Sequence, residues 1–278
     1  MVSIPSTADT ALFETSPDNN LGGNTDVPSG TTSSGFKSRG LFKFDLAGQI
    51  PTNATVTNVS LTLKVTRTSN GASNSTFLVR RVLRDWGEGS KTSSTGQPAT
   101  AGEATWNARF APSTLWNNPG ASLGVDYSST ISASKFVSGL GSYTFTSTTA
   151  LIADVQAWLN TPATNFGWLV LSQDEGVNST ARRFGSREDT TNAPVLVVQY
   201  TTSAPVPPQL TGVTLTNGSF RFEFTAEAGK TYTVESRGGL TSGSWTTFTN
   251  LAAQPVNTNL LILAPLSVSN GFYRVRTP

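Results

Sequence analysis

The stretch Ala181-Arg-Arg-Phe-Gly-Ser-Arg-Glu-Asp189, with the run Pro194-Val-Leu-Val-Val-Gln-Tyr200 that follows it, decides the fold class. In an extended strand, side chains two positions apart share a face. Phe184 is therefore predicted to enter a core, while Arg183 and Arg187 are predicted to point to the opposite face. Two such cations either meet a ligand or pair with the acidic residues that follow them, and the pattern leaves both alternatives open.

The same period of two recurs along the first 200 residues and predicts an all-β fold. The expected strands are residues 4–13, 39–46, 59–65, 77–86, 143–145, 165–171 and 194–200. In the second of them, Phe42, Phe44 and Leu46 are predicted to face the core. Arg39 and Lys43 alternate with them, so they are predicted to lie on the other face, which is either a solvated face or part of a binding surface.

Three other features divide the chain. Apolar residues at helical spacing predict one helix at residues 149–159, which Pro162 stops. Residues 89–130 lack a regular pattern but contain tryptophans, which predicts a long ordered insertion anchored by those rings. The alternative role for those rings is stacking on a sugar. A Pro-rich linker is predicted at 202–208. It separates a large β-sandwich at residues 1–201 from a small one at 209–278.

Composition excludes several kinds of site. The 278-residue chain has no cysteine and no histidine, so it builds no disulfide, no thiolate or imidazole zinc site and no Ser-His-Asp triad. Residues 1–203 carry 14 Lys/Arg and 14 Asp/Glu, and the C-terminal part carries 5 and 3. The large domain is therefore neutral overall, and nucleic-acid binding is not predicted. Any anion site must be a local patch.

The loop at residues 16–26 is rich in Asp, Asn and Gly. Such loops serve either turn chemistry or calcium binding, because calcium prefers carboxylate, amide and backbone oxygens. The spacing matches no EF-hand. The alternatives are structural calcium near Asp9, Asp18, Asn20 or Asp26, or plain turns.

Several short motifs occur in an order that resembles one known family. They are Ala8-Asp-Thr10, residues 39–45, Asp85-Trp-Gly-Glu88, Ala104-Thr-Trp106, Asp154-Val-Gln-Ala-Trp158, Asn165-Phe-Gly-Trp168 and residues 184–188. Over about residues 3–200 the chain resembles the DNRLRE-type domain, a jelly-roll module related to an alginate-binding carbohydrate-binding family. The name-giving motif is not strictly present. The resemblance implies a secreted, non-catalytic module whose basic residues meet uronates, and the matching positions are Arg39, Lys43, Arg183 and Arg187.

The C-terminal part carries a second resemblance. Its motifs Tyr232-Thr-Val-Glu-Ser236, Leu240, Trp245 and Phe272-Tyr-Arg-Val275 are similar to C-terminal sorting or spacer domains of bacterial secreted proteins. The implied fold is of the fibronectin III or immunoglobulin type, and the implied role is attachment or spacing. We expect an extracellular or cell-surface protein in which a start methionine, Met1, has replaced an export signal. No membrane-spanning run of about 18 apolar residues is present.

Three functions from different classes follow. In the first, the four basic residues bind an acidic polysaccharide, a uronate or sulfated glycan, and an exposed Trp86 ring stacks on a sugar. In the second, the protein is a structural or adhesion module whose arginines form ion pairs. In the third, it is a polysaccharide lyase or hydrolase, although no pair of carboxylates stands out for hydrolysis. The first of these, without catalysis, is the prediction.

Overall fold

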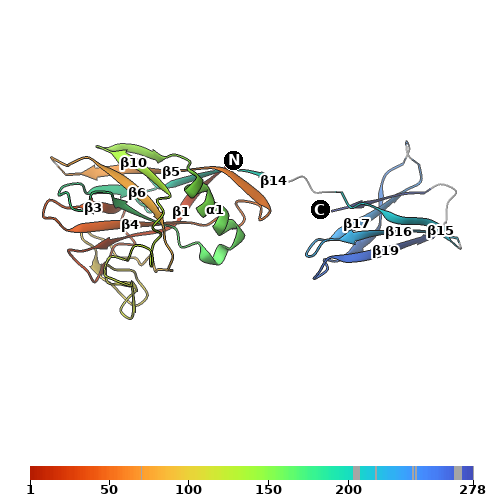
Figure 1. The fold of residues 1–278 in the computed structure, drawn as a ribbon, viewed down its shortest axis with the longest axis horizontal. Coiled ribbons are helices and arrows are strands. Elements are labelled where there is room, and N and C mark those ends of the chain that lie inside the picture. Colours follow the sequence, from red (N-terminus) through yellow and green to blue (C-terminus); the bar gives the residue numbers. More distant parts are fainter. Residues whose placement is uncertain are drawn as a thin grey trace. The chain divides into compact units, whose positions relative to one another are not determined.

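The computed structural model describes residues 1–69, 71–202, 207–216, 218–239, 241, 243–265 and 271–277. The chain divides into two compact units, residues 1–202 and 203–278 (Figure 1). Residues 203–206 of the predicted linker lie outside the described residues, as does Leu240 of the C-terminal motif.

The large unit is built almost wholly of strands. These are β1 (Val2–Phe13), β2 (Asn19–Asn20), β3 (Asp26–Thr31), β4 (Lys37–Phe44), β5 (Ala54–Thr68), β6 (Ser75–Arg81), β7 (Gln97–Pro98), β8 (Ala108–Phe110), β9 (Thr114–Leu115), β10 (Ala133–Val137), β11 (Gly141–Phe145), β12 (Trp168–Ser172), β13 (Arg182–Gly185) and β14 (Val195–Thr202). One α-helix, α1 (Thr149–Asn160), and a short 3-10 helix, η1 (Pro162–Thr164), complete it. The all-β prediction with one short helix is confirmed. Within the described residues, no helix has the length and apolar character needed to span a membrane.

Two antiparallel layers share strand β1. Its first part, Val2–Pro5, pairs with β14, and its second part, from Ser6 to Phe13, pairs with β4. One layer runs β1-β14-β5-β13-β3, and the other runs β1-β4-β12-β6-β10. Because β3 also bonds to β4, six strands close into a hydrogen-bonded ring in the order β1-β14-β5-β13-β3-β4. The sandwich is therefore closed along both sides by strands that cross from one layer to the other.

The main core lies between these layers. Phe42 of β4, Leu61 of β5 and Phe184 of β13 are fully buried there, as the period of two predicted. Helix α1 packs its apolar side against the same core (Figure 1). Its first turn is capped by Thr148, whose hydroxyl accepts a hydrogen bond from the backbone N–H of Leu151 at 3.0 Å.

A second core covers the outer face of the β4–β12–β6 layer. Leu41 and Leu169 project from the strands and pack against the insertion tryptophans Trp106 and Trp116, which are both buried. The predicted anchoring by tryptophan is confirmed. The expectation that this face of residues 39–46 is open was wrong, because a period of two identifies the side of a strand and not what lies over it.

The C-terminal unit consists of two three-stranded antiparallel sheets. One is β15-β16-β19 and the other is β18-β17-β20. Their bounds are β15 (Thr211–Thr216), β16 (Ser219–Ala226), β17 (Tyr232–Arg237), β18 (Thr246–Leu251), β19 (Thr258–Pro265) and β20 (Phe272–Arg276). The buried residues Phe222, Phe224, Tyr232, Val234 and Ile262 form a core of their own.

Candidate functional site

Arg39 is held inside the molecule. Its guanidinium donates to both carboxylate oxygens of Glu175, at 2.8 and 2.7 Å, and to the backbone carbonyls of Gly120 and Ala121, at 2.6 and 3.0 Å. Burial opposes the charge on Arg39, but the hydrogen bond and the Coulomb attraction of Glu175, together with weaker attractions of Tyr127 and Glu14, outweigh it, so the pKa of the guanidinium is raised. Arg39 thus ties the insertion to β4, and its donors are used within the fold.

Lys43 and Trp86 lie nearby on the same side of the fold. Lys43 is one-third exposed and its amine lies 3.5 Å from Asp85. Trp86 is 5% exposed, packs in the second core, and its indole N–H donates to the carbonyl of Phe166 at 2.8 Å. The expectation of an exposed Trp86 ring was therefore wrong, because the insertion and Phe166 cover both its apolar surface and its polar edge.

Arg187 lies in the turn after β13 rather than on the strand. Its guanidinium contacts Glu88 at 2.5 and 3.0 Å and Glu188 at 3.0 Å. The hydrogen bond to Glu88 raises the pKa of Arg187. Glu188 was a predictable partner because it follows Arg187 directly in the sequence. Glu88 was not predictable, because it lies almost 100 positions away and the fold brings it to Arg187.

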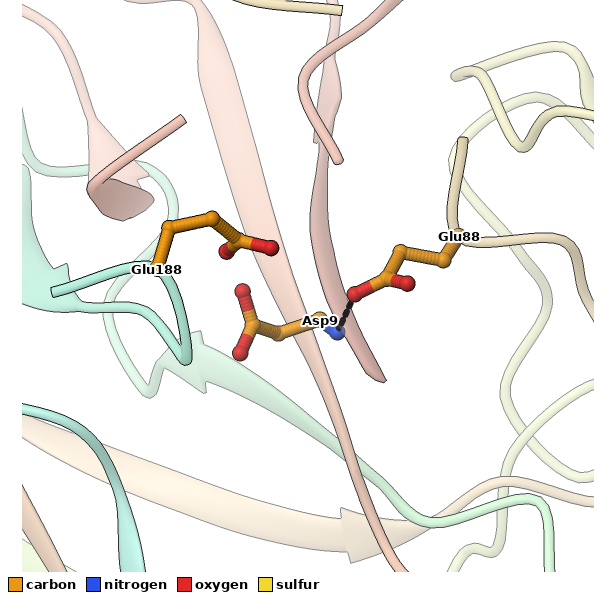
Figure 2. Close-up of side chains that lie close together, drawn as sticks. All are labelled: Asp9, Glu88 and Glu188. Carbon is orange, nitrogen blue, oxygen red and sulfur yellow. Dashed lines mark hydrogen bonds between the residues drawn. The ribbon is translucent and has the colours of Figure 1, made fainter. Parts of the chain in front are cut away.

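Asp9, Glu88 and Glu188 form a cluster of carboxylates, whose candidate ligand atoms all lie within 4.8 Å of one another (Figure 2). Asp9 is almost fully buried, its backbone N–H donates to Glu88 at 2.9 Å, and its carboxylate accepts from the backbone N–H of Arg187 at 2.8 Å. Burial raises the pKa of Asp9 to about 8, opposed by that backbone bond and assisted by the two glutamates. One oxygen of Glu188 is buried without a hydrogen-bond partner among the described residues. Carboxylate oxygens so arranged suit a hard cation such as calcium.

The other residues predicted to bind metal have separate environments. Asp18 accepts from the side-chain amide of Asn107 at 2.9 Å. Asn20 is buried and donates to the carbonyls of Glu88 and Ala104, at 2.7 and 2.9 Å. Within the part of the chain that the structure describes, Asp9 is the one predicted metal residue that belongs to a carboxylate cluster.

Arg183 borders an open cleft of about 290 Å³. The cleft is lined by Phe13, Thr15, Pro28, Thr32, Ser33, Ser38, Arg67, Thr68, Ser69, Ser94, Thr95, Ser179, Ala181, Arg182 and Arg183. Arg183 donates to Asp26 at 2.6 Å and to the carbonyl of Ser94. Arg67 approaches the other oxygen of Asp26 only to 3.9 Å, and 66% of its side chain is exposed.

Arg182 adds a third cation beneath this cleft. It is 1% exposed and donates to the carbonyls of Ser73, Ser138, Thr180 and Ala181, at 2.7 to 3.2 Å. Burial lowers its pKa, although a guanidinium still keeps its proton. No carboxylate pairs with it among the described residues. Arg67 and Arg183 therefore share one carboxylate, Asp26, and Arg182 adds a buried charge that is bonded only to neutral groups, which makes the cleft a local positive patch on a neutral unit.

Sequence reasoning missed Arg67 and Arg182. Arg67 stands at the end of a long alternating strand and directly before a run of Thr, Ser, Asn and Gly, and loops at strand ends commonly carry binding residues. The position of Arg67 at the end of a strand was the one feature of the sequence that could have identified it as a binding residue. Arg182 lies two positions before Phe184, so the period of two places both side chains on the buried face of the strand. The pattern does not reveal that Arg182 lies close to Arg67.

One comparison bears directly on this unit. Residues 1–119 match the family described as carbohydrate-binding module family 96. The match implies carbohydrate binding and leaves the sugar unspecified. It confirms the predicted carbohydrate-binding resemblance over these residues, and the remainder of the chain, including the C-terminal unit, is unassigned. A search of curated proteins gives no match.

Proposed function

We propose that the large unit binds an acidic polysaccharide, without catalysis, in the cleft bordered by Arg67, Arg182 and Arg183. The observation that carries this proposal is that Arg67 and Arg183 share a single carboxylate, Asp26, above the buried charge of Arg182. Guanidinium groups match the planar oxygens of carboxylates and sulfates, so a uronate or a sulfated sugar is the favoured ligand.

Arg67 is the cation most available to a ligand. Its contact with Asp26 is long and most of its side chain is in water. A ligand carboxylate that binds Arg67 therefore disrupts only a weak ion pair. Hydroxyl side chains such as Thr15, Ser33 and Ser69 lie around the cleft, where they can exchange hydrogen bonds with sugar hydroxyls. The apolar side chains of Phe13 and Pro28 also line the cleft, and both are buried.

The lining argues against a glycoside hydrolase. Hydrolysis needs two carboxyl groups about 5–9.5 Å apart across the sugar bond. Among the described residues, no aspartate or glutamate lines this cleft. Incubation with alginate, pectin and sulfated galactans is expected to release neither new reducing ends nor unsaturated products.

A structural or adhesion module is the second candidate. The observation that favours it is the full pairing of Arg39 and Arg187 with carboxylates, since arginines in such pairs serve the fold. Either role suits an extracellular or cell-surface protein, which is the location we propose.

The test is electrophoretic retardation in gels that contain alginate or polygalacturonate. Arg67→Gln combined with Arg183→Gln is expected to weaken retention at least tenfold, because each charge-assisted bond contributes about 1.5–3 kcal/mol. Arg84→Gln is the matched control, since Arg84 is also exposed but does not line the cleft. Unchanged retention in the double variant, with normal folding, contradicts the acidic-glycan proposal.

We also propose that calcium binds at Asp9 with Glu88 and Glu188. The buried, unpartnered oxygen of Glu188 and the close approach of three carboxylates support this site. Arg187 already neutralises part of their charge, so the ion would have to compete with it. Millimolar calcium should raise the melting temperature of the wild type at pH 8 and leave Asp9→Asn unchanged. Equal responses of the two proteins would contradict the site.

A further inference from the structure

A second cleft, of about 480 Å³, lies within the insertion. It is lined by Asp18, Ala99, Thr105, Asn107, Ala108, Ala111, Pro112, Leu115, Trp116, Asn117 and Pro119. Ligand clefts in proteins typically measure about 300–1,000 Å³, so this one is large enough for a sugar unit. It shares no lining residue with the cationic cleft.

The polar groups of this cleft match sugar hydroxyls. Asp18 is exposed, and one of its carboxylate oxygens accepts from the side-chain amide of Asn107 at 2.9 Å. Its other oxygen accepts no hydrogen bond among the described residues. A carboxylate can accept from two neighbouring hydroxyls, and an adjacent amide can both donate and accept, so the pair can engage a diol.

The charge of the lining selects against an anion. Of the described residues that line the cleft, Asp18 is the one that carries a charge, and no lysine or arginine joins it there. A uronate or a sulfated sugar would bring a second negative charge close to that carboxylate without a compensating cation. A neutral sugar meets no such penalty.

Apolar side chains provide a surface for the carbon face of the ring. Leu115 is 60% exposed although it is a large aliphatic residue, and Pro112 and Pro119 lie in the same lining. Trp116 beneath them is fixed, because its indole N–H donates to the carbonyl of Thr105 at 2.9 Å. An apolar surface beside a few hydrogen-bonding groups is typical of ligand-binding clefts.

The cleft is also preorganised. The carboxylate of Asp126 accepts from the backbone N–H groups of Asn117 and Ser122, at 2.9 and 2.7 Å. The backbone N–H of Trp116 donates to the carbonyl of Asn107 at 3.2 Å. These bonds fix the loop before a ligand arrives, which reduces the entropy lost on binding.

We infer that this cleft is a second carbohydrate-binding site, which takes a neutral hexose or pentose unit of a polysaccharide. Asp18 and Asn107 would bind its hydroxyls, and Leu115 with the two prolines would cover its apolar face. The protein would then bind two chemically different sugars, an acidic one at the arginine cleft and a neutral one here. The inference does not depend on the acidic-glycan proposal, because the two clefts are lined by different residues.

The test uses the full chain in gels that contain galactomannan, xylan or mixed-linkage β-glucan. The wild type should be retarded by at least one of them, and Asp18→Ala should weaken that retardation at least tenfold. Asp45→Ala is the matched control, because Asp45 is also exposed and also accepts one hydrogen bond, from the backbone N–H of Ala47 at 2.9 Å. Arg183→Gln should leave retardation by the neutral glycan unchanged.

A second variant protects the test against loss of folding. Leu115→Ser changes an exposed side chain, so it should keep the melting temperature and still weaken retardation by the neutral glycan. Absence of retardation by all three polysaccharides overturns the inference. So does equal retardation of the wild type, Asp18→Ala and Leu115→Ser.

Discussion

The outer face of β4 and the arginine cleft both carry cations, and they differ in how those cations are used. Arg39 on β4 is buried and contributes its donors to Glu175 and two carbonyls. Arg67 at the cleft is mostly exposed and shares Asp26 at 3.9 Å. The availability of an arginine thus depends on how many carboxylates surround it and on what covers it, more than on the face of its strand.

The largest expected effect is on the buried side of this comparison. Arg39→Met should lower the free energy of unfolding by about 3–5 kcal/mol, because it leaves the carboxylate of Glu175 without its cation in a largely buried place. Urea denaturation measures it. Arg67→Met is the matched control and should change stability by less than about 0.5 kcal/mol, as exposed substitutions do.

Retention on acidic glycan should show the reverse order of effects for Arg39→Met and Arg67→Met. The folded fraction of Arg39→Met should bind as the wild type does, and Arg67→Met should bind more weakly. If Arg39→Met kept normal stability but lost retention on acidic glycan, Arg39 would be a ligand-binding residue and not a structural one.

A pH-dependent effect should appear at the carboxylate cluster, where Arg187 is fully paired. The pKa of Asp9 is raised from 3.8 to about 8 in the folded protein. The folded state therefore binds more protons than the unfolded state between about pH 4 and pH 8, and stability should fall as pH rises through that window. One proton limits the slope to about 1.4 kcal/mol per pH unit.

Asp9→Asn should flatten that slope, since the amide does not titrate. Thermal unfolding of both proteins at pH 5, 6.5 and 8 provides the measurement. Parallel curves for wild type and variant would show that Asp9 does not titrate in this window.

Salt should distinguish the exposed cations from the buried ones. Salt screens exposed charges strongly at high ionic strength, so raising sodium chloride from about 0.05 to 0.5 M should weaken retention on alginate several-fold. The Arg39–Glu175 pair is shielded from solvent, so the stability it contributes should change little. Retention that is insensitive to salt would speak against ion pairing at Arg67.

The smallest effect is expected at Lys43. Its contact with Asp85 is 3.5 Å long and both side chains are substantially exposed. Such pairs contribute about 0–1 kcal/mol, so Lys43→Ala should leave both stability and retention nearly unchanged. A marked loss of acidic-glycan retention in Lys43→Ala would indicate that the glycan binds at the outer face of β4 and not at the arginine cleft.

Much of the fold could be predicted because its signals are local. Phe42, Leu61 and Phe184 lie in the core as the period of two required, and helical spacing located α1. The burial of Trp106 and Trp116 was expected from large apolar rings within an otherwise polar insertion.

The site was harder to predict, because it depends on contacts between distant segments. Nothing in residues 39–46 reveals that the insertion covers Arg39, and the insertion has no periodicity from which its position could be inferred. The sharing of Asp26 by Arg67 and Arg183 joins residues more than 100 positions apart. Glu88 meets Arg187 over a similar separation.

Hydrogen–deuterium exchange with and without an oligouronate tests the central claim most directly, because it locates the ligand. We expect added protection in peptides that span residues 31–34, 66–69 and 179–183, around the arginine cleft, and unchanged exchange at residues 39–46 and 84–88. Protection confined to residues 39–46 and 84–88, with none at the cleft, would contradict the account.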